Sequence, residues 1–127
     1  MTKHISKIEK LIAELCPNGV PACRQAGSFG RISNSDLLPK SKNDVWYIYV
    51  LECDNGSLYK GFTTDIKQRY IQHISGKGAN YTRVHKPINL LYYEVCNSEK
   101  EAVEREKYLK SGSAREILKQ LQRIDYD

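Results

Sequence analysis

Residues 45–51, VWYIYVL, give the strongest signal for the fold, because they consist only of β-branched, aromatic and aliphatic residues. This composition is typical of a β-strand. Residues 54–56, Asp-Asn-Gly, are typical of a tight turn, and residues 57–63 predict a second strand. We therefore expect a β-hairpin over residues 45–63.

A helix and a third strand are predicted downstream of the hairpin. Thr64 or Asp65 can cap the helix, which ends at the Gly-Lys-Gly of residues 76–78. A basic loop is expected from there to Pro87, and residues 88–96 predict the third strand.

Two capping boxes predict two helices at the end of the chain. Ser98 precedes Glu101 by three residues, and Ser113 precedes Glu116 by the same interval. The expected order is thus β-β-α-β-α-α. This order predicts an α+β fold with a small three-stranded sheet flanked by helices.

The first 44 residues give a different signal. Apolar residues at helical spacing predict a short amphipathic helix over residues 3–15, which ends at Pro17. Residues 17–44 are rich in Pro, Gly, Ser and Asn and show no sustained periodicity, so we expect a linker or a poorly ordered arm. We therefore divide the chain into an N-terminal arm, residues 1–44, and a folded domain, residues 45–127.

Charge and aromatic content point to a polyanionic partner. The chain of 127 residues has a formal net charge of +5 and contains nine Tyr but only two Phe. Residues 60–86 hold six Lys or Arg and one acidic residue. A basic, tyrosine-rich surface suits nucleic acid, whereas the alternative is that the charge only aids solubility.

Membrane and metal-cage classes are disfavoured. The longest apolar run has seven residues, against about 20 for a membrane-spanning helix. With no apolar stretch at the N-terminus to suggest a secretory signal, we expect a cytoplasmic protein without disulfides and without a membrane. The four cysteines form no CxxC pair, which disfavours a zinc site.

Five side chains with chemical potential come at intervals that this fold can bring together. The hairpin places the strand that carries Tyr49 beside the strand that carries Tyr59. Arg69 and His73 follow on the next helix at i, i+4 spacing. Glu106 lies beside the apolar stripe of its helix, where a carboxylate is explained by a bound metal ion or by an ion pair on the surface.

These residues carry a resemblance to the GIY-YIG nuclease domain. The half-motifs read Tyr-Ile-Tyr at residues 47–49 and Tyr-Lys-Gly at residues 59–61, and Arg69, His73 and Glu106 follow at the spacing of the family. The resemblance covers residues 45–121. Within it, residues 75–83 and 106–110 are similar to the small stand-alone bacterial branch, which is related to the N-terminal nuclease domain of the excision-repair protein UvrC.

Two positions depart from the family pattern. Tyr47 stands where the glycine that gives the family its name would be, a change that is common in the stand-alone branch. Phe62 stands where UvrC-like members carry a lysine thought to assist catalysis, so that role is absent here or passes to His73.

The resemblance implies a divalent-metal-dependent endonuclease that hydrolyses phosphodiester bonds in DNA, in repair or in the processing of branched structures. It implies that Glu106 holds one Mg²⁺ or Mn²⁺ ion and that Arg69 contacts the scissile phosphate. Tyr49 is the first candidate for the general base, Tyr59 positions water or phosphate, and His73 is a second candidate for the base or a proton relay. As a base at neutral pH, Tyr49 needs Arg69 and the metal ion to lower its pKa from about 10.

Further basic residues are expected to hold the flanking nucleic-acid backbone: Lys60, Lys77, Arg83, Lys86 and Lys110. DNA is the expected partner and RNA the second candidate, with a protein partner for targeting. Two other classes stay open. One is a non-catalytic nucleic-acid-binding module on the same scaffold, and the other is a toxin-like or partner-dependent nuclease that is silent alone.

Overall fold

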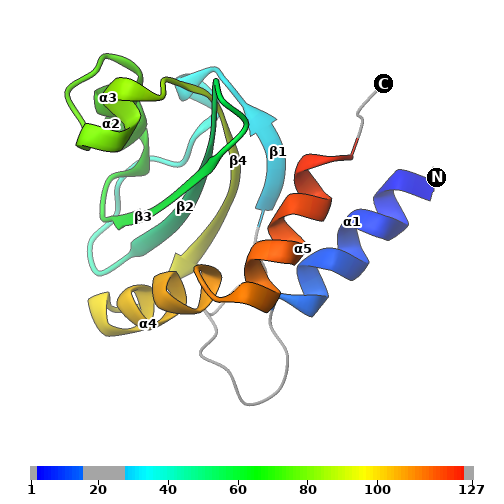
Figure 1. Ribbon diagram of the computed structural model, residues 1–127. Coiled ribbons are helices and arrows are strands. Elements are labelled where there is room, and N and C mark those ends of the chain that lie inside the picture. Colours follow the sequence, from blue (N-terminus) through cyan, green and yellow to red (C-terminus); the bar gives the residue numbers. More distant parts are fainter. Residues whose placement is uncertain (1–2, 16–27, 125–127) are drawn as a thin grey trace.

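A four-stranded antiparallel sheet forms the centre of the computed structural model, which describes residues 3–15 and 28–124 (Figure 1). The strand order is β1-β4-β2-β3, and each neighbouring pair is antiparallel. In chain order the elements are α1 (Lys3–Glu14), β1 (Ser28–Ile32), the short 3-10 helix η1 (Ser35–Leu37), β2 (Trp46–Cys53), β3 (Leu58–Thr63), α2 (Ile66–Ile74), α3 (Asn80–Val84), β4 (Pro87–Cys96), α4 (Glu99–Leu109) and α5 (Gly112–Gln122).

The predicted hairpin is confirmed as β2 and β3. The backbone N–H of Cys53 donates to the carbonyl of Ser57 at 2.9 Å, and Gly56 in the turn adopts a φ of 84°, which favours glycine. The Asn55 side chain accepts a hydrogen bond from the backbone of Ser57 and so closes the turn locally.

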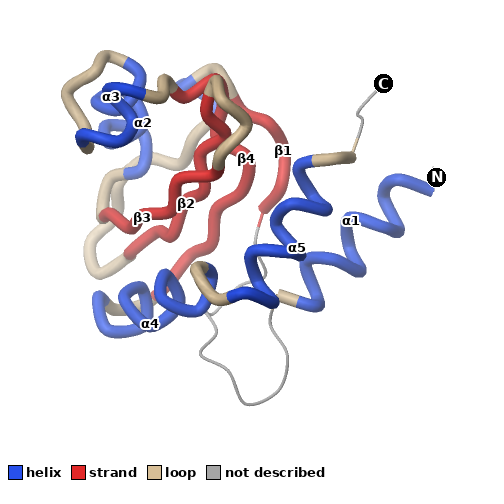
Figure 2. The backbone as a smooth tube through the Cα atoms, viewed as in Figure 1, coloured by secondary structure: helices blue, strands red, loops and turns tan. Residues whose placement is uncertain are grey.

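Both faces of β2 are buried, because helices cover both sides of the sheet (Figure 2). Ile48 and Val50 point into a core that they share with α1, α4 and α5. Tyr47, Tyr49 and Leu51 point to the opposite face, into a core shared with α2. The alternation of side chains along a strand therefore sends Tyr49 to the α2 side.

Side-chain caps confirm the starts of α2 and α4. The Asp65 carboxylate accepts from the backbone of Gln68 at 3.0 Å, and the Ser98 hydroxyl accepts from Glu101 at 3.2 Å. The second predicted capping box is wrong, since α5 begins at Gly112 and no cap is made by the side chain of Ser111, its N-cap residue. α3 lies where a loop was expected.

The prediction of an α+β fold is confirmed, but the predicted number of strands is wrong. β1 comes from the segment interpreted as a linker and pairs with the edge of β4, with Phe29 opposite Tyr92. The predicted N-terminal helix is α1, and Leu11 and Leu15 are buried in the core beside α5. Whether residues 45–127 fold without the first 44 residues stays a prediction for a truncation experiment.

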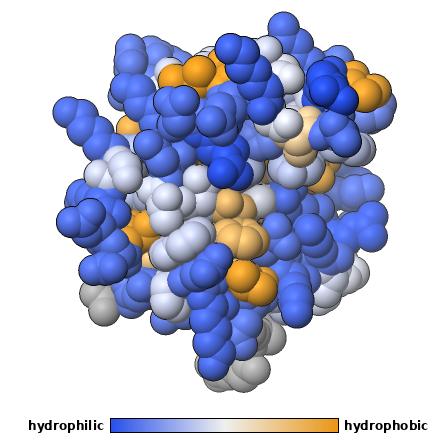
Figure 3. All heavy atoms as spheres, turned by 90° about the vertical axis from the view of Figure 1, so that its left-hand side faces the viewer, coloured by the Kyte–Doolittle hydropathy of each residue, from blue (hydrophilic) through white to orange (hydrophobic). Residues whose placement is uncertain are grey.

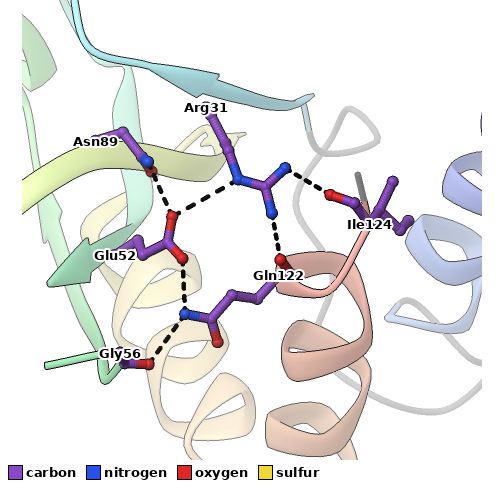
Figure 4. A network of polar contacts seen from close by, with 6 residues as sticks. All are labelled: Arg31, Glu52, Gly56, Asn89, Gln122 and Ile124. Atoms are coloured by element: carbon purple, nitrogen blue, oxygen red, sulfur yellow. Dashed lines mark hydrogen bonds and ion pairs between the residues drawn. The ribbon is translucent and has the colours of Figure 1, made fainter. Parts of the chain in front are cut away.

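A polar network joins β1 to the rest of the fold (Figure 4). The Arg31 guanidinium donates to the carbonyls of Gln122 and Ile124, at the C-terminal end of α5, and lies 3.7 Å from the Glu52 carboxylate. Glu52 also accepts from Asn89 and Gln122, both at 2.9 Å. Arginine near the last carbonyls of a helix satisfies acceptors that lack an intrahelical donor.

Two further expectations concern cysteines and membranes. Cys96 is disulfide-bonded, contrary to the prediction of reduced cysteines, whereas Cys53 is a free buried thiol. None of the helices in the described part of the chain combines the length and hydrophobicity needed to cross a lipid bilayer.

Candidate active site

Tyr49 lies in the middle of β2, directly opposite Gly61 of β3. A Cβ atom on Gly61 would lie 2.5 Å from the Tyr49 hydroxyl oxygen and 2.6 Å from Cζ. The Tyr49 ring therefore passes over a position that only glycine can occupy without displacing it. This packing gives a physical reason for glycine at the end of the second half-motif.

The Tyr49 hydroxyl begins a chain of buried hydrogen bonds. Its oxygen lies 2.8 Å from Nε2 of His73, whose Nδ1 lies 2.7 Å from the Thr82 hydroxyl. Thr82 donates its only hydroxyl proton to the Ala79 carbonyl at 3.0 Å. Thr82 must then accept from Nδ1, so the proton of neutral His73 is on Nδ1 and Tyr49 donates to Nε2.

Gly78 leaves the space that His73 needs. A Cβ atom there would lie 2.5 Å from Nδ1 of His73. His73 is only 1% exposed, so its ring is enclosed between the Tyr49 hydroxyl and the turn that follows α2. Gly61 therefore leaves space for Tyr49, and Gly78 leaves space for its hydrogen-bond partner His73.

Burial dominates the protonation of this pair. Burial raises the pKa of Tyr49 to about 12, the neighbouring Tyr59 adds to the increase, and Arg69 acts in the opposite direction. Burial lowers the pKa of His73 to about 4, and the positive charge of Arg69 contributes. The expectation that Arg69 brings the Tyr49 pKa below its usual range is not met among these side chains, because burial outweighs it. At pH 7 the pair is a neutral phenol and a neutral imidazole.

A cleft of about 400 Å³ brings together four of the five predicted catalytic residues. Tyr49, Tyr59, Arg69 and Glu106 all line it, although they come from β2, β3, α2 and α4. His73, the fifth, is absent from the lining and lies behind Tyr49. The rest of the lining consists of Trp46, Gly61, Phe62, Thr63 and Thr64.

Arg69 is half-buried on α2, one turn before His73. Its Nε donates to the Gln72 side chain at 3.1 Å, which orients the guanidinium. The guanidinium lies close enough to Tyr49 to oppose the increase in its pKa. A positioned guanidinium at the wall of a cleft is suited to binding a phosphate with two parallel hydrogen bonds.

Glu106 is the carboxylate of the cleft, with a side chain that is 18% exposed. It lies 3.1 Å from Lys110 at i, i+4 spacing, so the surface ion pair considered from the sequence is present as well. The buried residues of α4 are Ala102, Arg105 and Leu109. Glu106 therefore flanks the buried stripe, as expected, whereas the fully buried charge on this helix is Arg105.

Arg105 was not identified from the sequence as a buried residue. Its Nε and Nη2 each lie 2.7 Å from a carboxylate oxygen of Glu94 on β4, and both side chains are almost completely buried. The Tyr92 hydroxyl also donates to Glu94. This ion pair lies inside the core and attaches α4, which carries Glu106, to the sheet.

The residues around Glu106 fit one mode of Mg²⁺ binding, in which the protein supplies few of the ligands. Among the residues that the structure describes, no cluster of three or more His, Cys, Asp or Glu could enclose a metal ion. Mg²⁺ in nucleotide-processing sites is often held by one or two carboxylates together with substrate phosphates and water. Glu106 in an open cleft fits this mode and does not fit a metal cage made of protein alone.

A second cleft of about 570 Å³ adjoins the first, since Tyr59 and Glu106 line both. Its lining includes Lys60 and Lys110, which were predicted to bind nucleic acid. Arg115 and Lys119 of α5 complete the basic wall and were not predicted.

The remaining predicted contacts lie away from this cleft. Arg83 and Lys86 line a smaller cavity of about 180 Å³ behind His73, and Lys77 is exposed in the turn after α2. The structure therefore separates the five predicted backbone-binding residues into two groups. The i, i+4 spacing of Arg115 and Lys119 indicates from the sequence only that they share a face of α5, and not that this face borders the cleft.

Comparison with known proteins identifies the family of the chain that forms this cleft. The family model described as the GIY-YIG catalytic domain matches residues 45–119, which span all the residues that line the first cleft. The chain belongs to the GIY-YIG family. The GIY-YIG domain is of nuclease type, so a nucleic acid is its class of substrate, and members generally use a divalent metal ion.

Relatives of this GIY-YIG chain are small bacterial proteins. A UPF0213 protein of Staphylococcus saprophyticus is 42% identical over 76 residues, which are 60% of this chain and 93% of that protein. A UPF0213 protein of Streptococcus agalactiae is 53% identical over 64 residues, which are 50% of this chain and 73% of that protein. The similarity to stand-alone bacterial GIY-YIG proteins is therefore confirmed.

One solved structure is also similar, the solution NMR structure of a UPF0213 protein from Bacillus halodurans. It is 41% identical, with a TM-score of 0.39, and the match covers 61% of this chain and 85% of that one.

Proposed function

We propose that this GIY-YIG chain is a divalent-metal-dependent endonuclease that hydrolyses phosphodiester bonds in DNA. The observation that carries the proposal is the meeting of Tyr49, Tyr59, Arg69 and Glu106 in one cleft, from four separate elements. We propose that it acts in DNA repair or in the processing of branched DNA. We further propose that it acts in the cytoplasm and that a protein partner delivers its substrate.

Arg69 is suited to binding the scissile phosphate. Hydrolysis by in-line attack of water places extra negative charge on the phosphoryl oxygens, and a fixed guanidinium can meet that charge with two hydrogen bonds. Gln72 accepts from Nε of Arg69 at 3.1 Å, and the guanidinium also interacts with the Tyr49 hydroxyl, so the group is held at the wall of the cleft. Tyr59, half-buried in the same wall, can orient the water or a phosphoryl oxygen.

Glu106 would hold one Mg²⁺ or Mn²⁺ ion, together with oxygens of the substrate and water. When bound, such an ion supplies Lewis-acid stabilisation of the charge on the phosphate and the leaving 3′ oxygen. Lys110 must then release the Glu106 carboxylate, from which it lies 3.1 Å away. Because Lys110 is exposed, it can turn towards the substrate backbone instead.

Tyr49 and His73 are suited to moving the proton of the attacking water in a relay. His73 is sealed behind Tyr49 and does not reach the cleft, so it cannot contact the water itself. With its pKa raised to about 12, Tyr49 is a phenol at neutral pH and not a standing base. In the relay, the water gives one proton to the Tyr49 oxygen while the Tyr49 proton passes to Nε2 of His73.

A specific observation favours a second candidate, a non-catalytic nucleic-acid-binding module. The Glu106 carboxylate is paired with Lys110, as it would be in a protein that needs no metal ion. The two candidates differ in one outcome, since a binding module retains nucleic acid without cutting it.

A cleavage panel tests the proposal. Branched, single-stranded and duplex DNA are incubated with Mg²⁺ or Mn²⁺ and with wild-type protein, Arg69→Ala or Lys67→Ala, and binding is measured in parallel. Loss of one positioned donor costs roughly 100- to 1,000-fold in rate, so we expect Arg69→Ala to cut at that reduced rate. Lys67 lies on the same helix but outside the cleft, and its variant should cut like the wild type. Binding without cleavage on every substrate would instead establish the second candidate.

A further inference from the structure

Four cations surround the second cleft, and they come from three separate parts of the fold. Lys60 lies on β3, Lys110 directly follows α4, and Arg115 and Lys119 lie one turn apart on α5. The lining also includes Tyr59 and Tyr81, whose rings are stacked with centroids 6.0 Å apart. The face on the left of Figure 1, with α2 and α3 above and α4 below, is mostly hydrophilic (Figure 3).

The four positive charges around this cleft face a single carboxylate in its lining. Within the described residues, Lys60, Arg115 and Lys119 form no ion pair, and the one carboxylate in the lining, Glu106, is paired with Lys110. Burial lowers the pKa of Lys60, and the charges of Arg115, Lys110 and Lys119 lower it further. Like charges gathered around a concave surface repel one another and attract anions.

The two clefts adjoin and share part of their lining. Tyr59 and Glu106 line both, with Arg69 on one side and the four cations on the other. A strand whose scissile phosphate lies between Arg69 and Glu106 can therefore continue past Glu106 along the basic wall. A ligand with a single phosphate can occupy only one of the two clefts at a time.

We propose that Lys60, Lys110, Arg115 and Lys119 form a binding site for backbone phosphates of the nucleic-acid strand beside the bond that is cut. The site makes the substrate a polynucleotide, and it sets the path of the strand from Arg69 past Glu106 towards α5. This inference rests on the proposed function for the identity of the first cleft, but its own observable is binding and not cleavage.

The test is the salt dependence of oligonucleotide binding by the full chain. Fluorescence anisotropy with labelled single-stranded and duplex DNA, without a divalent metal ion, gives Kd at several salt concentrations. Each phosphate contact contributes about 0.7 to the slope of log K against log salt for a single strand and about 0.9 for a duplex. The double variant Arg115→Ala/Lys119→Ala should therefore reduce the slope by about 1.4 to 1.8.

Arg123→Ala is the matched control. Arg123 follows α5, lies 4.0 Å from Glu116, and is absent from the cleft lining. Its variant removes a positive charge near the same helix and should leave the slope within about 0.3 of the wild type. The variant Arg115→Lys/Lys119→Arg keeps both positive charges and should show the wild-type slope.

The outcomes separate this inference from the proposed function. A reduced slope in the double variant, in a protein that never cleaves DNA, supports the phosphate site and refutes the nuclease. Cleavage by the wild type together with equal slopes for the double variant and Arg123→Ala overturns the phosphate site alone. Inorganic phosphate and a mononucleotide are also tested as competitors of the oligonucleotide. If either displaces it at concentrations near the competitor's own Kd for the cleft, the cleft binds a small phosphorylated ligand and the proposed strand site is overturned. If the double variant does not fold, Lys60→Met is measured in its place and should reduce the slope by about 0.7 to 0.9.

Discussion

At the scale of single residues, the absence of a side chain is as important as the side chains themselves. Gly61 and Gly78 allow Tyr49 and His73 to pack against the backbone at distances that a Cβ atom would prevent. The Thr82 hydroxyl then selects the form of His73 that can accept a proton from Tyr49. The Tyr49 phenol is therefore positioned by three residues that carry no charge.

Gly61→Ala tests this packing. We expect loss of about 1–3 kcal/mol in the free energy of unfolding and a large reduction in cleavage, because the methyl group would displace the Tyr49 ring. Urea unfolding and a cleavage assay measure the two effects. Gly30→Ala is the control, since a Cβ atom on that strand residue meets nothing within 4 Å. Equal stability and activity of the two variants would show that Tyr49 is not confined by Gly61.

The pH dependence of stability tests the neutral form of His73. Because burial lowers its pKa to about 4 from 6.5, unfolded chains bind a proton between these values that the folded protein does not. The contribution of neutral His73 to the free energy of unfolding is therefore fully present above pH 6.5 and is lost as the pH falls towards 4. One pKa unit corresponds to about 1.4 kcal/mol, so a loss of about 3 kcal/mol is expected.

His73→Gln isolates this contribution from that of the carboxyl groups. The free energy of unfolding is measured for both proteins between pH 7 and pH 4, and the difference between them should change by the stated amount. A constant difference across this range would mean that His73 has an ordinary pKa in the folded protein.

At the scale of elements, local patterns predicted β2, β3, α2 and α4, but not β1. The stretch VWYIYVL and the caps at Asp65 and Ser98 are strong local signals, and each is confirmed. β1 has five residues, SFGRI, without alternation, and it is a strand because β4 offers an unpaired edge. Such an edge exists only in the folded sheet, so no local sequence pattern predicts β1.

The candidate site shows the same division. Tyr49, Tyr59, Arg69 and Glu106 could be predicted because their spacing is that of a family motif, and the structure brings them into one cleft. Thr82, Arg115 and Lys119 were missed because only tertiary packing brings α3 and α5 to the site. Arg105 was missed because an arginine is usually solvated unless a partner such as Glu94 is buried with it.

α1 provides a test of whether the N-terminal residues belong to the folded core. Leu15 is completely buried, so Leu15→Ala should reduce the free energy of unfolding by about 2–5 kcal/mol. Glu14→Ala, at the neighbouring exposed position, should change it by less than about 0.5 kcal/mol. Urea unfolding that shows no difference between the two variants would mean that α1 does not pack against α5.

At the scale of the whole molecule, the sheet separates two cores and carries the candidate site at the α2 side and one end of α4. The network around Arg31 connects β1 to β2, β4 and the end of α5, so the first strand is tied to the end of the last helix (Figure 4). Truncation of residues 1–44 removes α1, β1 and the Arg31 contacts of this network together.

We therefore expect the truncated protein to be less stable than Leu15→Ala, with the edge of β4 exposed to pairing with other chains. The urea midpoint and the oligomeric state of residues 45–127 measure this. The sequence alone predicts a domain that folds independently from residue 45, and an unchanged midpoint for a monomeric truncated chain would establish that boundary.

The rate of Mg²⁺-dependent DNA cleavage by Glu106→Ala, compared with Glu104→Ala, is the decisive test of whether this cleft is a nuclease active site. Both glutamates lie on α4, but Glu104 is exposed and Glu106 lines both clefts. Since a bound divalent ion stabilises the transition state by several kcal/mol, we expect Glu106→Ala to cut at least ~100-fold more slowly, and Glu104→Ala to cut like the wild type. Equal rates in the two variants, or no Mg²⁺-dependent cleavage by the wild type, would contradict the assignment of this cleft as a nuclease active site.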